Sequence, residues 1–209
     1  MPRPYVIIYF TESIDGRIAS RTGYSKLSCP YDLKRLHSVR AQVDAVIVGA
    51  NTVRLDNPKL TVRLVEGRNP IRVLISASGN LDPGLNLFSV PPLTVVYTVS
   101  MEGGLERELK AKGVEIVRLS EITACSVVED LYSRFSVRKV LVEGGGKTVW
   151  SFVKEDCFDE LRVTVSPVIF GSGRNSVEGE GFDEGKRLRL KAFKPCECGQ
   201  EIYLIYEKG

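Results

Sequence analysis

The stretch D-A-V-I-V-G-A-N-T-V-R-L-D-N-P-K-L-T-V-R, residues 44–63, decides how the rest of the chain can be arranged. It opens with a short apolar run, residues 45–48, whose β-branched side chains predict a fully buried strand. Asn51 and Thr52 then supply capping side chains for a short helix. That helix must end near Pro58, because the residue before a proline is pushed out of the α region. The stretch therefore predicts a strand, a turn of helix and a loop.

Polar side chains crowd the segment that follows this strand: Thr52, Arg54, Asp56, Asn57, Lys59, Thr61 and Arg63. In open α/β sheets, ligands bind outside the carboxyl ends of the strands. An ordinary connection with a solvated, charged loop would carry a similar composition. The residues of this stretch alone do not decide between a binding site and such a loop.

Strands and helices alternate over most of the chain, which predicts a mostly parallel sheet. We expect strands at residues 5–10, 45–48, 71–75, 93–97, 114–117 and 139–142, and helices at 30–40, 105–112 and 127–135, with another ending near 153. The last sixty or so residues contain strand-like segments at 161–166, 188–193 and 202–206 and no clear helix. The sheet should therefore be mixed, with antiparallel strands at the end of one α/β domain, residues 1–209.

The helix expected at residues 30–40 begins with Pro30, which suits a first turn. Leu33, Leu36 and Val39 recur at helical spacing and should face inward. His37, the chain's one histidine, lies in this helix without an evident serine or cysteine partner. It is better interpreted as a packing or surface residue than as a catalyst.

Composition excludes several classes of function. Hydrophobic residues make up 43% of the 209 residues, yet no apolar run approaches the roughly 18 residues that span a bilayer. The chain starts at Met1 without the architecture of a signal peptide, so we expect a cytoplasmic protein with no membrane partner. Its net charge of +3, with basic and acidic residues evenly mixed, does not favour nucleic acid.

The five cysteines are Cys29, Cys125, Cys157, Cys196 and Cys198. This odd, scattered set does not indicate a disulfide framework. Cys196 and Cys198 lack the spacing of a zinc knuckle and have no second pair nearby in the sequence. We therefore expect no metal site.

A glycine-rich turn, Glu143-Gly144-Gly145-Gly146, joins an expected strand to a helix. Consecutive glycines let the backbone approach a ligand and aim free N–H groups of the helix start at an anion. The turn is neither G-x-G-x-x-G nor a P-loop, and a tight turn without a ligand is the alternative. Glu143 favours a function, because a carboxylate at the end of a buried strand needs a partner. A polar heterocycle with N–H donors would provide one.

Three segments together resemble the pyrimidine reductases of riboflavin biosynthesis. They are S-I-D-G-R-I-A at residues 13–19, the run from V-G-A-N-T-V to D-N-P-K-L-T-V-R at 48–63, and V-E-G-G-G at 142–146. Residues 167–171, P-V-I-F-G, add support. The resemblance implies a dihydrofolate-reductase-like fold of three layers, with helices on both faces of the sheet. It covers the chain from about Tyr5 to its end.

The resemblance also implies a reaction and a set of contacts. Members of the family use NADPH, with NADH as the other candidate donor, to reduce the ribosylamino group of a pyrimidinone 5′-phosphate to ribitylamino by hydride transfer to C1′. The cofactor contacts would be Thr52, Asp56, Ser76, Ala77, Ser78, Gly79, Gly145, Gly146, Lys147 and Thr148. The substrate contacts would be Arg40, Leu60, Arg63 and Glu143, with the two arginines on the 5′-phosphate.

Some assignments stay open. Relatives often carry aspartate where Ser76 stands, and residues 24–28 match the family weakly. Residues 20–29 should form a loop that could act as a lid. Asp56, Asp15 and an ordered water are all candidate proton donors, with Asp56 placed in the catalytic set.

The chain lacks the H-x-E and P-C-x-x-C ligands of the zinc deaminase that is fused to this reductase in many bacteria. We therefore expect a stand-alone reductase acting on the diamino substrate before deamination, and a homodimer by resemblance. A dihydrofolate reductase proper and a non-catalytic NADPH-binding module are the competing interpretations.

Overall fold

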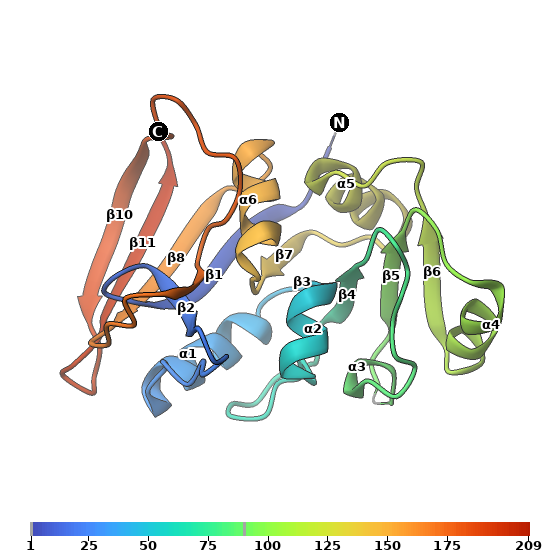
Figure 1. Cartoon of the computed structure of the whole chain (residues 1–209), viewed down its shortest axis with the longest axis horizontal. Helices are drawn as coiled ribbons and strands as arrows, with labels where there is room; N and C mark the ends of the chain where they lie inside the picture. The colour runs from blue at the N-terminus through green and yellow to red at the C-terminus, as the bar shows by residue number, and fades with distance from the viewer. Residues whose placement is uncertain (1, 90) are drawn as a thin grey trace.

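The computed structural model describes residues 2–89 and 91–209 and has a nine-stranded sheet at its centre (Figure 1). Met1 lies outside the described residues. In spatial order the strands are β10 (Leu188–Pro195), β11 (Ile202–Lys208), β8 (Glu160–Ser166), β1 (Tyr5–Ser13), β7 (Lys139–Val142), β3 (Ala45–Gly49), β4 (Ile71–Ile75), β5 (Thr94–Thr98) and β6 (Val114–Arg118). Every pairing from β8 to β6 is parallel, whereas β11 is antiparallel to β8 and to β10. The expectation of a mostly parallel sheet that ends in antiparallel strands is confirmed.

The order of the strands creates a crevice at the carboxyl ends of β1, β7 and β3. The chain passes from β1 to β3 and continues outward to β6. It then returns, and β7 lies between β1 and β3. Leu141 of β7 lies opposite Ile7 on one side and Val46 on the other. Such a reversal of direction is where open α/β sheets bind ligands.

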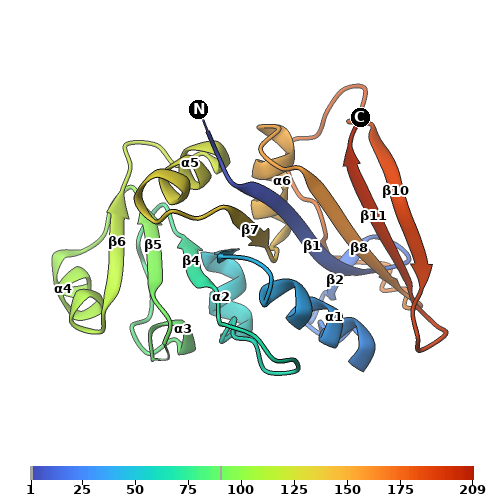
Figure 2. The same cartoon turned by 180° about the vertical axis from the view of Figure 1, so that it is seen from behind.

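Helices cover both faces of the sheet, as expected. Successive side chains of β1 point to opposite faces, so each face carries apolar side chains that must be covered. Val6, Ile8 and Phe10 belong to a core shared with α5 (Ala124–Arg134) and α6 (Gly146–Lys154). Ile7 and Tyr9 belong to a second core. The helices that contribute to the second core are α1 (Pro30–Arg40), α2 (Ala50–Asp56), α3 (Asn86–Ser89) and α4 (Gly103–Ala111). Figures 1 and 2 show α5 and α6 on one side of the sheet and α1, α2 and α3 on the other.

Helix α1 has the expected bounds, but its inward face differs from the prediction. Leu33 is 40% exposed, whereas Asp32, His37 and Arg40 are buried along with Val39. Apolar spacing misidentified this face because α1 packs against a polar part of the sheet, where hydroxyl and carboxylate groups need buried partners.

Two short strands were not predicted. β2 (Arg17–Ser20) and β9 (Gly173–Asn175) pair with each other in a separate antiparallel ribbon. β1 also continues to Ser13, beyond the expected end at residue 10. Residues 23–29 form a loop without regular structure, in agreement with the expectation. None of the helices among the described residues has the length and apolar character required to cross a bilayer.

The cysteines are less scattered in space than in sequence. Cys125 and Cys157 form a disulfide with Cα atoms 5.5 Å apart, a pairing that was not predicted, since the cysteine pattern argued against a disulfide framework. The sulfur of Cys29 lies 3.5 Å from that of Cys196, so these two thiols are close in space although Cys196 and Cys198 have no second pair nearby in the sequence. Both contacts join residues far apart in the chain, and local spacing carries no signal for them.

Candidate active-site cleft

A cleft of about 250 Å³ opens at the carboxyl ends of β1, β3 and β7. Its walls come from β1, from the glycine-rich turn after β7, from α1 and α2, from the loop at residues 23–29, and from the β2–β9 ribbon. The lining residues are Tyr9, Phe10, Thr11, Ile18, Ser25, Ser28, Leu36, Thr52, Asp56, Glu143, Gly144, Gly145, Arg174 and Ser176. The structure therefore brings together Thr52, Asp56, Glu143 and Gly145 from the predicted site.

The glycine-rich turn has a backbone that only glycine adopts easily. Gly144 has φ 102° and Gly145 has φ 77°. A Cβ atom added to Gly145 would lie 2.7 Å from Oγ1 of Thr52. Gly145 is also the N-cap of α6, so no side chain caps the first amides of that helix. A glycine cradle with uncapped amides fits the pyrophosphate of a dinucleotide.

Lys147 and Thr148 of α6 lie outside this cleft. They line a second hollow of about 150 Å³ together with Ile75 at the end of β4. Ser76, the next residue, is buried, and its Oγ has no hydrogen-bond partner among the described residues. Of the predicted cofactor contacts, Thr52, Asp56 and Gly145 line the cleft and Lys147 and Thr148 line the hollow, whereas Gly146 and residues 76–79 line neither.

Residues 76–79 form a tight turn after β4. The amide of Gly79, which has φ 59°, donates to the carbonyl of Ser76 at 3.0 Å. The carbonyl of Ala77 accepts from the amide of Val99 at 3.0 Å and from Oγ1 of Thr98 at 3.2 Å. Ser78 is exposed. The side chains of this turn are small, so space remains beside the end of β4, while backbone hydrogen bonds hold the turn in one conformation.

Glu143 already has a protein partner. Nε and Nη2 of Arg40 donate to its two carboxylate oxygens, each at 2.5 Å, and both side chains are at least nine-tenths buried. Burial opposes the charge of Arg40, but Glu143 raises the pKa of this guanidinium. Glu143 therefore does not require a ligand as its partner, and that prediction is wrong. Arg40 does not line the cleft; it stands behind Glu143, which does.

Two further predicted substrate contacts lie outside the cleft lining. The side chain of Leu60 is buried in the core, and its backbone has φ 52°. Arg63 is exposed, and its Nη1 donates to Oγ1 of Thr61 at 2.7 Å. A substrate contact of Leu60 would have to use its backbone.

His37 connects the two arginines of the predicted site. Its Nδ1 accepts from the amide of Arg63 at 2.9 Å, and its Nε2 lies 3.4 Å from Nη1 of Arg40. Burial, followed by the charges of Arg40 and Arg63, lowers the pKa of His37 to about 4. A neutral imidazole is thus a packing group here, as the sequence suggested.

A buried network that was not predicted supports one wall of the cleft. Asp32 accepts from the hydroxyls of Tyr9 and Thr164 at 2.6 Å and from that of Thr11 at 2.7 Å. Ser28 donates to Oγ1 of Thr11 at 2.9 Å. Tyr9, Thr11 and Ser28 all line the cleft. The one available signal was an aspartate in the first turn of a helix with a weakly apolar face.

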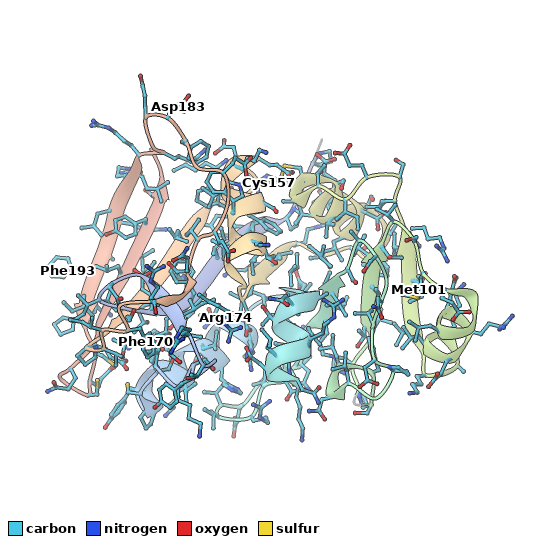
Figure 3. The ribbon with its side chains drawn as sticks, in the orientation of Figure 1. Met101, Cys157, Phe170, Arg174, Asp183 and Phe193 are labelled. Carbon is cyan, nitrogen blue, oxygen red and sulfur yellow. A yellow bond between two sulfur atoms is a disulfide. The ribbon has the colours of Figure 1, made fainter. Side chains whose placement is uncertain are left out.

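Arg174 of β9 (Figure 3) and Ser176, the residue after this strand, were also missed, because so short a strand gives little signal in the sequence. The side chain of Arg174 makes no hydrogen bond or ion pair with the described residues, whereas its backbone pairs with β2. Asp15 lies elsewhere. It accepts from Ser13 and from the amides of residues 170 and 171, and these bonds lower its pKa. Of the two carboxylates considered as proton donors, only Asp56 lines the cleft.

Residues 4–204 match the RibD C-terminal domain. The chain belongs to this family. It is 32% identical over 212 residues to the 2,5-diamino-6-ribosylamino-4(3H)-pyrimidinone 5′-phosphate reductase of Methanothermobacter thermautotrophicus, an alignment that covers 98% of each chain. The deaminase/reductase of Thermotoga maritima superposes with a TM-score of 0.85 at 30% identity, over 99% of this chain and 57% of that one.

A more distant likeness bears on the fold alone. The dihydrofolate reductase of Enterococcus faecalis superposes with a TM-score of 0.60 at 12% identity, over 98% of this chain and 96% of the other. The expected dihydrofolate-reductase-like fold is confirmed.

Proposed function

We propose that this protein reduces the ribosylamino group of 2,5-diamino-6-(ribosylamino)-4(3H)-pyrimidinone 5′-phosphate to a ribitylamino group, with NADPH as the hydride donor. The observation that carries the proposal is the cleft at the reversal of the sheet. There a glycine cradle with uncapped amides faces the carboxylate of Glu143. A reductase relative of nearly the same length supports the choice of substrate.

The residues of the cradle fit a nicotinamide dinucleotide. Thr52, Asp56 and Gly145 would hold it in the cleft, and Lys147 and Thr148 would hold it along the neighbouring hollow. The start of α6 at Gly146 and the turn after β4, Ser76, Ala77, Ser78 and Gly79, would add contacts beside them. The bound cofactor supplies a hydride, and the protein supplies position and electrostatics. A phosphate or ribose could hydrogen-bond to two sets of groups: the unpartnered Oγ of Ser76, and the first backbone amides of α6, which no side chain caps.

Glu143 would recognise the pyrimidine. Its carboxylate can accept hydrogen bonds from ring or amino N–H groups, and the two-pronged contact with Arg40 fixes its plane. In this proposal Arg40 contributes to substrate binding by orienting Glu143. Arg63 would hold the 5′-phosphate, and Leu60 would contact the substrate through its backbone.

Asp56 is the carboxylate we propose as proton donor. Reduction of the ring-opened imine places a hydride on C1′ and requires a proton on the adjoining nitrogen. Asp56 lines the cleft on the side of α2, next to Thr52. Most of the rate enhancement would come from holding C1′ in position, since effective molarities of oriented groups reach about 10⁵–10⁸ M.

We also propose that the chain forms one domain and a homodimer. The β10–β11 edge of the sheet exposes Leu190, Phe193 and Ile202, with exposed fractions of 50%, 66% and 49%. Figure 3 shows Phe193 at this edge. Apolar side chains grouped on a free sheet edge favour an interface. Light scattering on the purified chain would give the mass of the assembly.

The decisive assay follows NADPH absorbance with three substrates: the diamino ribosylaminopyrimidine phosphate, its deaminated counterpart, and dihydrofolate. We expect oxidation with the diamino compound and a higher kcat/KM for it than for the deaminated one. Turnover of dihydrofolate alone would make the protein a pterin reductase. NADPH binding without turnover of any substrate would make it a binding module. Repeating the assay with NADH tests the choice of cofactor.

A further inference from the structure

Four side chains with metal-ligating chemistry gather away from the cleft: Cys29, Cys196, Cys198 and Glu201. One ligand atom from each lies within 4.8 Å of the others. Cys29 is the N-cap of α1, and the other three belong to the turn between β10 and β11. In both views this turn lies beside the start of α1 (Figures 1 and 2).

We propose that these four residues form a structural zinc site that fastens the β10–β11 turn to the start of α1. A tetrahedral Zn²⁺ with Zn–S bonds of about 2.3 Å holds its sulfur ligands about 3.8 Å apart. The sulfurs of Cys29 and Cys196 are 3.5 Å apart, close to that spacing. The remaining distances, at most 4.8 Å, require a closure of about 1 Å or less between sulfurs and about 1.3 Å or less between a sulfur and the oxygen of Glu201. Four protein ligands leave no open position, which is typical of structural zinc sites.

Glu201 supplies the strongest indication of a missing cation. It is 4% exposed, and its Oε1 accepts from the amide of Cys29 at 2.7 Å. Its Oε2 is buried and has no hydrogen-bond partner among the described residues. An unsatisfied buried carboxylate oxygen destabilises a fold. A cation bound beside the three thiols would satisfy it.

The turn itself holds the ligands in place. The amide of Cys196 donates to the carbonyl of Glu201 at 2.8 Å, and the amide of Gly199 donates to the carbonyl of Cys196 at 2.8 Å. Gly199 has φ 72°, a conformation that glycine adopts without strain. The hairpin therefore presents Cys196, Cys198 and Glu201 together, although C-E-C lacks the usual spacing of a zinc knuckle.

Each sulfur also has an N–H donor, as thiolate ligands commonly do. The amide of Asp32 lies 3.4 Å from Sγ of Cys29, and Nη2 of Arg35 lies 3.5 Å from Sγ of Cys196. The backbone amides of residues 200 and 201 donate to Sγ of Cys198. Such outer contacts orient metal ligands and moderate their charge.

A disulfide between Cys29 and Cys196 is the competing interpretation of the short sulfur–sulfur distance. It would leave the third thiol and the unpartnered oxygen of Glu201 without a role, whereas a metal uses all four groups. The site would also bear on the cleft, since Ser28, the neighbour of Cys29, lines its wall. Zinc would thus hold one end of the loop at residues 23–29.

The test is the zinc content of the untagged full chain, expressed in zinc-supplemented medium and purified with a phosphine reductant and no chelator. We expect one zinc per chain by plasma mass spectrometry. Cys196→Ser and Glu201→Gln should each lower the zinc content at least about tenfold after dialysis against a weak chelator. Cys125→Ser, which removes a cysteine of the distant disulfide, should keep its zinc. A chelator should lower the Tm of wild type and Cys125→Ser, and have no effect on Cys196→Ser.

Cobalt titration of the metal-free wild type gives a readout that does not depend on how well the variants fold. We expect thiolate-to-metal charge-transfer bands and the visible bands of tetrahedral Co²⁺, saturating at one ion per chain. Wild type that contains no zinc and develops no such bands would overturn the site. Peptide mapping that joins Cys29 to Cys196 in the metal-free protein, even under reductant, would assign the cluster to a disulfide instead.

Discussion

Arg40 and Glu143, which are 103 residues apart in the sequence, form a two-pronged ion pair at the wall of the cleft. Each carboxylate oxygen accepts one guanidinium N–H at 2.5 Å. Arg40 is fixed in turn through Nη1, which donates to the carbonyl of Thr61 at 3.1 Å. A planar, two-pronged contact leaves the carboxylate little freedom to rotate. The pair therefore joins the end of β7 to α1 and presents Glu143 to the cleft in one orientation.

Glu143→Gln tests both functions of this pair. The amide keeps the shape of the side chain but removes the charge that balances a buried guanidinium. Removing one partner of a buried ion pair costs about 3–5 kcal/mol. We therefore expect the free energy of unfolding, measured in urea, to decrease by an amount close to that cost. The KM for the pyrimidine should rise, because an N–H acceptor is lost, while NADPH affinity should stay close to that of wild type.

The double variant Arg40→Gln/Glu143→Gln separates stability from recognition. Replacing both partners is less costly than leaving one charge unpaired, so the double variant should be more stable than Glu143→Gln. Its KM should stay high, because the carboxylate is still missing. Recovery of KM together with stability would mean that Glu143 serves only to neutralise Arg40.

Gly145→Ala should weaken NADPH binding, measured by fluorescence titration. The added Cβ would lie 2.7 Å from Oγ1 of Thr52, inside the proposed cradle. Gly113→Ala is the matched control, since Gly113 has a similar positive φ of 78°, its added Cβ would meet nothing within 4 Å, and it does not line the cleft. Both variants should lose about 1–3 kcal/mol of stability from backbone strain. Only Gly145→Ala should lose cofactor affinity beyond that loss, and equal NADPH affinities would argue against the cradle.

The sequence predicted best those features that are local in the chain. Pro30 marked the first turn of α1, and the glycines at 144–145 marked a backbone with positive φ, because each of these depends on one residue and its neighbours. The ion pair of Arg40 with Glu143 was beyond prediction, although both residues had been assigned to the site. A pairing over such a separation depends on how β7 inserts between β1 and β3.

The same limit explains the other omissions. Arg174 reaches the cleft only because the short ribbon of β2 and β9 folds over it, and a three-residue strand leaves almost no periodic signal. Cys29 meets Cys196 across 167 residues, so motif spacing could not reveal the thiol cluster. The burial of Asp32 and His37 was not predicted, because helical periodicity assigns apolar residues to the buried face.

His37→Asn should make the protein less sensitive to mild acid. The pKa of His37 is about 4 in the folded chain against an ordinary value of 6.5. Between these values the unfolded chain binds a proton that the folded chain does not, so the free energy of unfolding falls as the pH drops from 6.5 toward 4. Below the folded pKa this contribution levels off.

The amide side chain of the His37→Asn variant could still accept the N–H of Arg63, the bond that Nδ1 of His37 makes at 2.9 Å, but it would not titrate. Urea unfolding at about pH 7 and about pH 4.5 gives the comparison. Wild type should lose more stability between the two conditions than His37→Asn, while shared carboxylates affect both proteins alike. Equal losses in the two proteins would show that His37 is not held neutral by its surroundings.

The last prediction concerns the arginine that holds the 5′-phosphate of the substrate. Arg63 occupies the position that the family resemblance implies, although it is exposed and its Nη1 contacts Thr61. Arg174 lines the cleft, and its side chain has no hydrogen-bond or ion-pair partner among the described residues. A guanidinium contact to phosphate contributes about 1.5–3 kcal/mol, which corresponds to about ten- to hundredfold in kcat/KM. The measurement is kcat/KM for the phosphorylated substrate and for its dephosphorylated analogue.

We expect Arg63→Ala to lose most of its preference for the phosphorylated compound, and Arg63→Lys to recover only part of it, because lysine lacks the planar fork. Arg54→Ala is the control, since Arg54 is an exposed arginine of α2 that contacts the carbonyl of Asn80 and does not line the cleft. Its preference should equal that of wild type. If Arg174→Ala abolishes the preference while Arg63→Ala retains it, the phosphate is bound from the β9 side. The substrate would then lie across the cleft in the opposite direction, with Arg63 serving only to fix the loop after α2 through Thr61 and His37.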